Sequence, residues 1–361
     1  MYALSREGSE RWAPTELGPI KASPMLGTAD GGHQFIYAAT AAANGKMFAL
    51  DAADGALAAT CPPGPSFYVG GFLGSTALVR PGPGPFEGAL GLASGSKLVN
   101  IRPTATGADP TCITTDSPAT QAFAANIVLS GADAFLATAE GLVRAFTLDS
   151  GNWVKNAGWG GGLGYVGVGD RSIQAIALSP SSVVGTTSLK GIFNLARASG
   201  GLQSSFPPGG LSSDPGGLIL IPDAGVFGDG QSPTPLLYSV AVDLVSGTTI
   251  SLTEALVGSP VAGSGGFIYL ASLSGTLEAR RGPMSLFWTG SFGSSESFLA
   301  SPTIGCSESS ALGALYLPSV TGSLFSVVVD SPGLDPSAPW PKYQHDVRNT
   351  GNPTTPIQSC P

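Results

Sequence analysis

The chain has 361 residues, of which 42% are hydrophobic and only 11% are charged, against about 25% charged residues in an average domain. Its 52 glycines and 30 prolines argue against a helical protein, because both residues are unfavourable inside helices. Disordered chains are excluded as well, since they are poor in aliphatic residues and rich in charge. An all-β protein with many short strands and tight turns remains.

The charge balance bears on the partners of the protein. The net charge is −8, and Arg280-Arg281 is the only notable basic pair, which disfavours nucleic-acid binding. No segment approaches the roughly 18 consecutive apolar residues of a transmembrane helix. Arg6, Glu7, Glu10 and Arg11 make the first twelve residues unlike a signal peptide.

Segments of similar sequence recur along the chain about every 46 residues. Each well-preserved copy begins with Ser-Pro-x-aliphatic-Gly, at 23–27, 259–263 and 301–305, and continues through an apolar stretch to an alternating segment that a glycine usually introduces. The alternating segments lie at 45–50, 95–101, 141–146, 191–195, 236–242, 275–279 and 322–327. A four-stranded propeller blade has this period, and blades must stack because one sheet cannot bury both of its faces. The sequence therefore predicts an all-β propeller of four-stranded antiparallel blades, with seven or eight blades and eight favoured for the full-length protein.

The N-terminus matches the middle of a repeat, since Met1-Tyr2-Ala3-Leu4 is similar to Met47-Phe48-Ala49-Leu50. We therefore expect one propeller domain, 1–361, composed of a half blade (1–20), seven repeats (21–339) and a C-terminal closing segment (340–361). Residues upstream of Met1 are expected to hold the missing strands and an export signal, so the predicted location is secreted or periplasmic.

Two polar or glycine-rich patterns have a plain structural interpretation. Residues 51–55, 149–152 and 243–247 each place an aspartate before a glycine, which predicts hairpin turns; the spacing of an EF-hand calcium loop is absent. Residues 162–167 spell GxGxxG, but no helix of sufficient length can follow them. We therefore expect a loop between blades there, not a dinucleotide site.

The repeats at 23–57 and 259–280 resemble the quinoprotein-like (PQQ-like) β-propeller repeat. Residues 340–351, WPKYQHDVRNTG, resemble the segment that borders such propellers in exported bacterial proteins. This resemblance implies an eight-bladed disc in the periplasm or outside the cell. Trp340 and Tyr343 suit an outer strand packed on its neighbour. His345-Asp346 is expected to stabilise a turn, because no Ser or Cys nucleophile stands beside it.

The active site of the quinoprotein dehydrogenases is not reproduced in the sequence. Those enzymes use two adjacent cysteines and a calcium site, and this chain has neither adjacent cysteines nor one region that combines the Trp, Glu and Asn required. A GxSxG motif is also absent. We expect no catalytic, cofactor-binding or metal-binding residue, and a non-catalytic scaffold that binds a protein or a surface glycan. A degenerate quinoprotein-type dehydrogenase or a propeller hydrolase is the alternative.

The four cysteines, Cys61, Cys112, Cys306 and Cys360, have no CxxC spacing, and His33 and His345 lie far apart, which disfavours zinc. Disulfides are favoured over buried thiols, and they require an oxidising compartment. Cys306 is expected to pair with Cys360, because this bridge would anchor the C-terminal tail. Cys61 then pairs with Cys112 by elimination.

Overall fold

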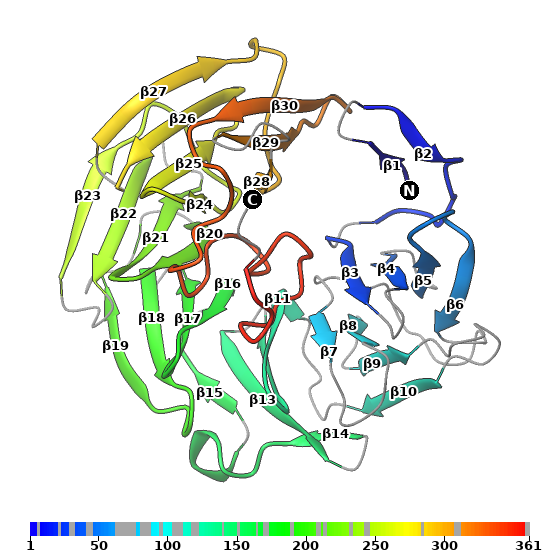
Figure 1. Cartoon of the computed structure of the whole chain (residues 1–361). Helices are drawn as coiled ribbons and strands as arrows, with labels where there is room; N and C mark the ends of the chain where they lie inside the picture. The colour runs from blue at the N-terminus through cyan, green and yellow to red at the C-terminus, as the bar shows by residue number, and fades with distance from the viewer. Residues whose placement is uncertain are drawn as a thin grey trace. The chain divides into compact units, whose positions relative to one another are not determined.

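Figure 1 shows the computed structural model of the whole chain. The described residues are 1–5, 8–20, 23–28, 33–40, 46–61, 77–79, 88–93, 97–102, 111–116, 123–138, 141–149, 152–163, 165–168, 173–187, 191–206, 211, 215–230, 234–241, 246–282, 285–306 and 312–357. For the strand residues between 59 and 125, the description covers the backbone only.

Consecutive strands pair antiparallel in the order in which they occur in the chain. Six sheets have four strands each in this order, and the third of them also takes in β15 (Tyr165–Gly167). These sheets are β3 (Met25–Thr28), β4 (Gln34–Ala39), β5 (Met47–Asp51) and β6 (Leu57–Cys61); β7 (Ala77–Val79), β8 (Gly88–Ala93), β9 (Lys97–Arg102) and β10 (Thr111–Asp116); β11 (Phe123–Ser130), β12 (Asp133–Thr138), β13 (Leu142–Asp149) and β14 (Asn152–Lys155); β16 (Ile173–Leu178), β17 (Ser182–Thr187), β18 (Gly191–Ala196) and β19 (Leu202–Phe206); β20 (Pro215–Ile221), β21 (Ala224–Asp229), β22 (Leu236–Ala241) and β23 (Gly247–Ser251); β24 (Val261–Gly263), β25 (Phe267–Ala271), β26 (Thr276–Arg281) and β27 (Ser285–Ser291).

Two further sheets are smaller. β28 (Thr303–Cys306), β29 (Gly313–Pro318) and β30 (Leu324–Val329) form a three-stranded sheet, and β1 (Ala3–Leu4) pairs with β2 (Glu10–Trp12). Four-stranded antiparallel blades are thus confirmed. In the described part of the chain the number of full blades is six, below the predicted seven or eight, because the last repeat contributes three strands and the N-terminus two.

The described residues form two compact units. The first comprises residues 1–139, 144–156 and 348–352, and the second comprises 140–143, 157–347 and 353–361. In the second unit the first strands of successive sheets, β16, β20, β24 and β28, contact one another in that order. In the first unit β3 contacts β7, and β7 contacts β11. The division into one domain with the predicted segment boundaries stays a prediction.

Apolar side chains fill the space between neighbouring sheets in the second unit. One cluster joins the sheet of β24–β27 to that of β28–β30 through residues such as Tyr269, Phe298 and Leu315. Another joins the sheets of β20–β23 and β24–β27 through Ile219, Leu237 and Ile268. Burial of both faces of a sheet is what the repeat period predicts for stacked blades.

The serine of the Ser-Pro repeat has a structural role that the sequence did not reveal. The backbone N–H of Ser259 donates to Oγ of Ser301, its counterpart in the next repeat, at 2.8 Å. On its other side Ser259 lies against Gly217 of β20, where a Cβ atom would lie only 1.9 Å from Ser259 Oγ and 2.7 Å from its backbone N. The serine therefore links successive first strands at close approach.

The predicted turn at residues 51–55 is confirmed. Asp51 Oδ1 accepts from the N–H of Ala53, Asp54 Oδ1 accepts from that of Ala56, and Gly55 has φ 74°. The other two predicted turns include residues outside the described ranges. The GxGxxG segment is not wholly a loop, because Tyr165–Gly167 forms β15. A 3₁₀ helix, η3 (Gly160–Gly162), precedes that strand.

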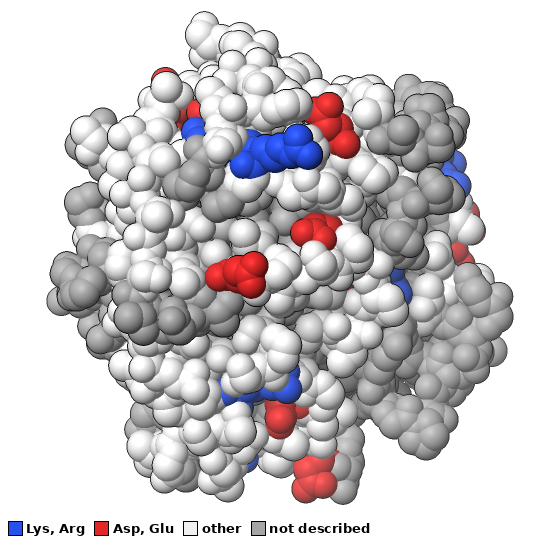
Figure 2. All heavy atoms as spheres, turned by 60° about the vertical axis from the view of Figure 1, so that its left-hand side comes forward, with Lys and Arg blue, Asp and Glu red and all other residues white. Residues whose placement is uncertain are grey.

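Charged side chains are few and scattered on the face drawn in Figure 2, where blue and red spots alternate on a mostly uncharged surface. No helix within the described ranges is long and apolar enough to cross a membrane.

Candidate functional site

The C-terminal segment 334–341 lies along the first strands of two sheets in the second unit. Leu334 forms a β-bridge with Gly263 of β24, and Trp340 forms one with Leu220 of β20. The carbonyl of Pro341 accepts from the N–H of Ala262 at 2.7 Å. The expectation of an outer strand around Trp340 and Tyr343 is therefore wrong: Trp340 adds to the edge of a first strand and is 1% exposed.

The next part of the segment, 348–352, makes equivalent contacts within the first unit. Arg348 exchanges two hydrogen bonds with Leu26 of β3, one through its backbone carbonyl and one through Nε, both at 2.9 Å. Asn349 Nδ2 donates to the carbonyl of Pro24, which belongs to the Ser-Pro repeat. Gly351 accepts from the N–H of Leu129 in β11 at 2.8 Å. The edges of these first strands are thereby paired.

A tight turn between these two parts places His345. Gln344 and His345 have φ values of 61° and 73°, and the N–H of Asp346 donates to the carbonyl of Gln344 at 2.9 Å. Positive φ is unfavourable for residues other than glycine and is often found where function requires it. His345 Nδ1 lies 3.2 Å from Asp346 Oδ2, and its ring packs against Trp340 at 5.1 Å between centroids. As expected, His345-Asp346 stabilises a turn.

Lys342 is a buried cation beneath this turn. Its Nζ donates to the carbonyls of Tyr343 at 2.6 Å and Asp346 at 3.1 Å. Burial lowers the pKa of Lys342 from 10.5 to about 8, while the charge of Asp346 opposes part of this shift. The lysine thus holds the turn together at a cost in desolvation.

Stability should therefore rise with pH between about 7 and 9.5. In this range the unfolded chain keeps the proton on Lys342 and the folded chain loses it, so the unfolded state binds more protons and rising pH favours folding. The two pKa values give a gain of about 2 kcal/mol over the window. Tyr238 and Tyr269 oppose this effect at higher pH, because burial raises their pKa values above 10.

The measurement is urea unfolding of the protein and of Lys342→Met at pH 7 and 9.5. The gain should disappear in Lys342→Met and persist in Lys155→Met, because Lys155 is exposed on β14. An equal gain in all three proteins would contradict the prediction.

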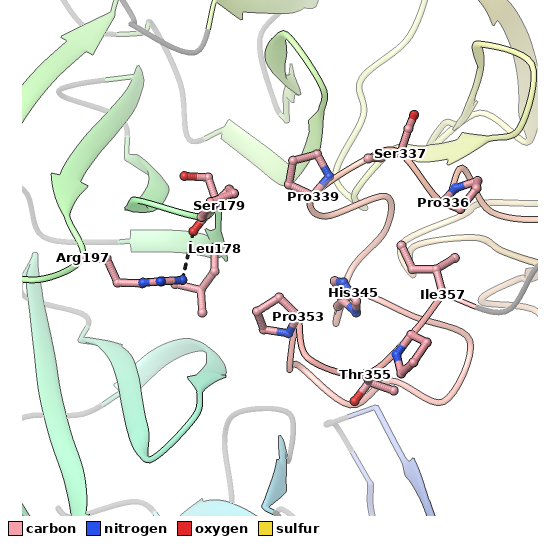
Figure 3. A pocket seen from close by; sticks show the side chains of 13 residues that line it. Leu178, Ser179, Arg197, Pro336, Ser337, Pro339, His345, Pro353, Thr355 and Ile357 are labelled. Carbon is pink, nitrogen blue, oxygen red and sulfur yellow. Dashed lines mark hydrogen bonds between the residues drawn. The ribbon is translucent and has the colours of Figure 1, made fainter.

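A pocket of about 410 Å³ opens beside this turn, wholly within the second unit (Figure 3). Arg197 and Leu178 lie on one side, and Pro339, His345 and Ile357 lie on the other. Its lining is mostly proline and aliphatic, and consists of Leu178, Ser179, Pro180, Arg197, Pro336, Ser337, Ala338, Pro339, His345, Pro353, Thr355, Pro356 and Ile357. We call this the C-terminal pocket.

Ser179 and Arg197 lie together on one side of the C-terminal pocket, whereas its other polar residues, Ser337, His345 and Thr355, lie on the opposite side. Nη1 of Arg197 donates to the carbonyl of Ser179 at 3.3 Å, and Oγ of Ser179 accepts from the N–H of Ser182 at 3.1 Å. The backbone of Arg197 is also held, since its carbonyl accepts from Nε1 of the buried Trp159. Across the described part of the chain, Arg197 has no carboxylate partner.

A smaller cavity of about 150 Å³ adjoins the C-terminal pocket, and the two share Ser179, Pro180 and Pro339. Val184, Ile192, Leu220 and Ile221 give it an aliphatic lining. We call it the aliphatic cavity.

The cysteine predictions stay predictions. Cys306 ends β28, whereas Cys360 lies outside the described residues, and the side chains of Cys61 and Cys112 are not described. No group of three or more His, Cys, Asp or Glu residues in the described ranges could hold a metal ion. Neither the C-terminal pocket nor Arg197 was predicted from the sequence, because Arg197 follows β18 in an ordinary turn.

Comparisons with known proteins place the fold. No family model matches the sequence, and no curated protein does. Among solved structures 1124 chains match, and a shared fold does not by itself imply a function. One of them is the crystal structure of BamB from Moraxella catarrhalis, with a TM-score of 0.61 and 13% identity over 89% of this chain and 86% of that one. At this identity the likeness shows the fold alone, and it confirms the predicted β-propeller.

Proposed function

We propose that this protein is a non-catalytic β-propeller scaffold that binds another protein through the C-terminal pocket. The observation that carries the proposal is the composition of this pocket. It has the size of a ligand site, its walls are proline and aliphatic residues, and it holds one cation without an anionic partner among the described residues. The propeller fold shared with BamB is consistent with a binding role.

The chemistry at the pocket supports binding over catalysis. A serine hydrolase needs a serine hydroxyl bonded to its histidine. Nδ1 of His345 lies 3.2 Å from Asp346, as the histidine and aspartate of a triad do, but within the described residues no serine hydroxyl bonds to its ring. A quinoprotein dehydrogenase, the other alternative, would need a calcium site, which the sequence motifs do not supply.

A protein partner is favoured over a surface glycan by the same lining. None of the described residues that line the pocket is Trp, Tyr or Phe, so no flat aromatic face is offered to a sugar ring. Prolines and aliphatic side chains suit the apolar residues of a peptide.

The proposal also covers the cellular location of the protein and its family. We propose that it is an exported member of the quinoprotein-like repeat propellers, at the bacterial cell envelope or outside the cell. The Ser-Pro repeat and residues 340–351 support the family, and the four cysteines support export.

Site-specific photo-crosslinking tests the function. A benzophenone amino acid at Ser337, which is exposed at the pocket, is expected to give a discrete protein adduct in the native host. The same group at Thr248, exposed on β23, is the control and should not give that adduct. The adduct should weaken in the Arg197→Glu background, because the reversed charge repels an anionic partner. Equal labelling from both positions, or none from Ser337, would contradict the proposal.

A further inference from the structure

We infer that the C-terminal pocket recognises the C-terminal carboxylate of a peptide that ends in an aliphatic residue. Arg197 and Ser179 would hold the carboxylate, and the last side chain would enter the aliphatic cavity. This inference rests on the proposed function and names the chemistry of its ligand.

The charge of Arg197 selects the carboxylate. A guanidinium has five N–H donors in a planar fork that matches the two oxygens of a carboxylate. The structure uses one side-chain donor, Nη1, on the carbonyl of Ser179. This bond orients the guanidinium and leaves the others for a ligand. The hydroxyl of Ser179 accepts from the N–H of Ser182 and keeps its own hydrogen to donate.

Arg197 is the one Lys or Arg among the described residues that line the pocket, which places the carboxylate beside it. Five of the lining residues are prolines, which have no backbone N–H to donate. The side-chain oxygen of Ser337 already donates to Asp335 at 2.6 Å. On the opposite wall Nδ1 of His345 lies 3.2 Å from Asp346 Oδ2, so this nitrogen is engaged within the turn.

The aliphatic cavity can hold the side chain of the last residue of the peptide, which bears the carboxylate. It meets the C-terminal pocket at Ser179 and Pro180, beside the Arg197 donors, and its volume is about 150 Å³. Its lining is mainly apolar, with Asn194 and two serines, and an apolar cavity of that size can hold a group as large as benzene. A leucine or isoleucine side chain therefore fits there.

The size of the pocket favours a chain end over an internal segment. About 410 Å³ is near the lower end of the range for small-ligand sites, so it holds a few residues only. A free carboxylate also offers both oxygens to the guanidinium with little steric hindrance.

Fluorescence polarisation with the whole chain tests the inference. The probes are fluorescein-labelled pentapeptides that end in leucine, with the penultimate residue varied, each made as the free acid and as the carboxamide. We expect the free acids to bind and the carboxamides to bind at least about tenfold more weakly, because the amide lacks the charge that strengthens its hydrogen bonds with the guanidinium. Arg197→Gln should weaken the free acids by a similar factor.

Two variants complete the design. Ala224→Leu should fill the aliphatic cavity and weaken peptides that end in leucine more than those that end in glycine. Arg281→Gln removes an exposed cation at the end of β26 and should leave binding unchanged. Circular dichroism checks that each variant folds.

The outcomes separate this inference from the proposed function. Equal binding of the acid and the amide, or unchanged binding in Arg197→Gln, overturns the inference that the pocket recognises a C-terminal carboxylate. An adduct from Ser337 without any pentapeptide binding at about 1 mM also overturns it and leaves the scaffold standing. Acid-selective binding that depends on Arg197, without an adduct in the host, supports the inference and removes the proposed function.

Discussion

Replacing Trp340 by alanine is expected to lower the free energy of unfolding by about 3–5 kcal/mol. Trp340 is 1% exposed and is one of the largest fully buried side chains in the described part of the protein. Its backbone pairs with Leu220, and its ring packs on His345. Removal of the ring leaves a cavity beneath the closing segment, and such a cavity adds to the lost burial of the ring itself.

Urea unfolding followed by circular dichroism measures the loss. Trp288→Ala is the matched control, because Trp288 is partly exposed on β27 and should cost less. Trp340→Phe should lose less stability than Trp340→Ala and more than Trp288→Ala, since a smaller ring keeps part of the packing on His345. A loss in Trp340→Ala no larger than that in Trp288→Ala would show that the segment contributes little to stability.

Gly217→Ala is expected to destabilise the protein by about 3 kcal/mol, at the upper end of the range for overpacked sites. The added Cβ would lie 1.9 Å from Oγ of Ser259 and 2.7 Å from its backbone N and Cα. The hydroxyl can turn away, but the backbone atoms are held by the bond from Ser259 N–H to Ser301 Oγ. Two successive first strands must therefore separate.

Gly201→Ala is the control for this substitution. The nearest atom to its added Cβ is Ser199 Oγ at 3.6 Å, and its backbone does not need positive φ. The free energy of unfolding should change by less than about 1 kcal/mol in Gly201→Ala. The same small change in Gly217→Ala, measured by urea unfolding, would mean that the Ser-Pro contact is loose.

The strands that the sequence predicted best are those with a repeated local signal. The alternating segments at 45–50, 275–279 and 322–327 correspond to β5, β26 and β30, each the third strand of its sheet. Alternation and a leading glycine are local properties, so neighbouring residues suffice to reveal them. The Ser-Pro copies at 23–27 and 259–263 likewise mark the first strands β3 and β24.

The candidate site could not be predicted in this way. Its lining combines Ser179 and Arg197 with residues 336–357, which are far apart in the chain and follow no period. The outer-strand prediction for Trp340 failed for a related reason. An aromatic residue suits any buried edge, and its neighbours in sequence do not say which strand it will join.

The contacts of the closing segment also set an order of events during synthesis. Leu26 and Arg348 are 322 residues apart, and Pro24 and Asn349 are 325 apart. On the ribosome, β3 and β11 emerge long before residues 348–352 exist, so their edges start without these partners. Unpaired strand edges attract other chains, and contacts of such separation form slowly. We therefore expect nascent chains to need protection from aggregation until Arg348 has left the ribosome.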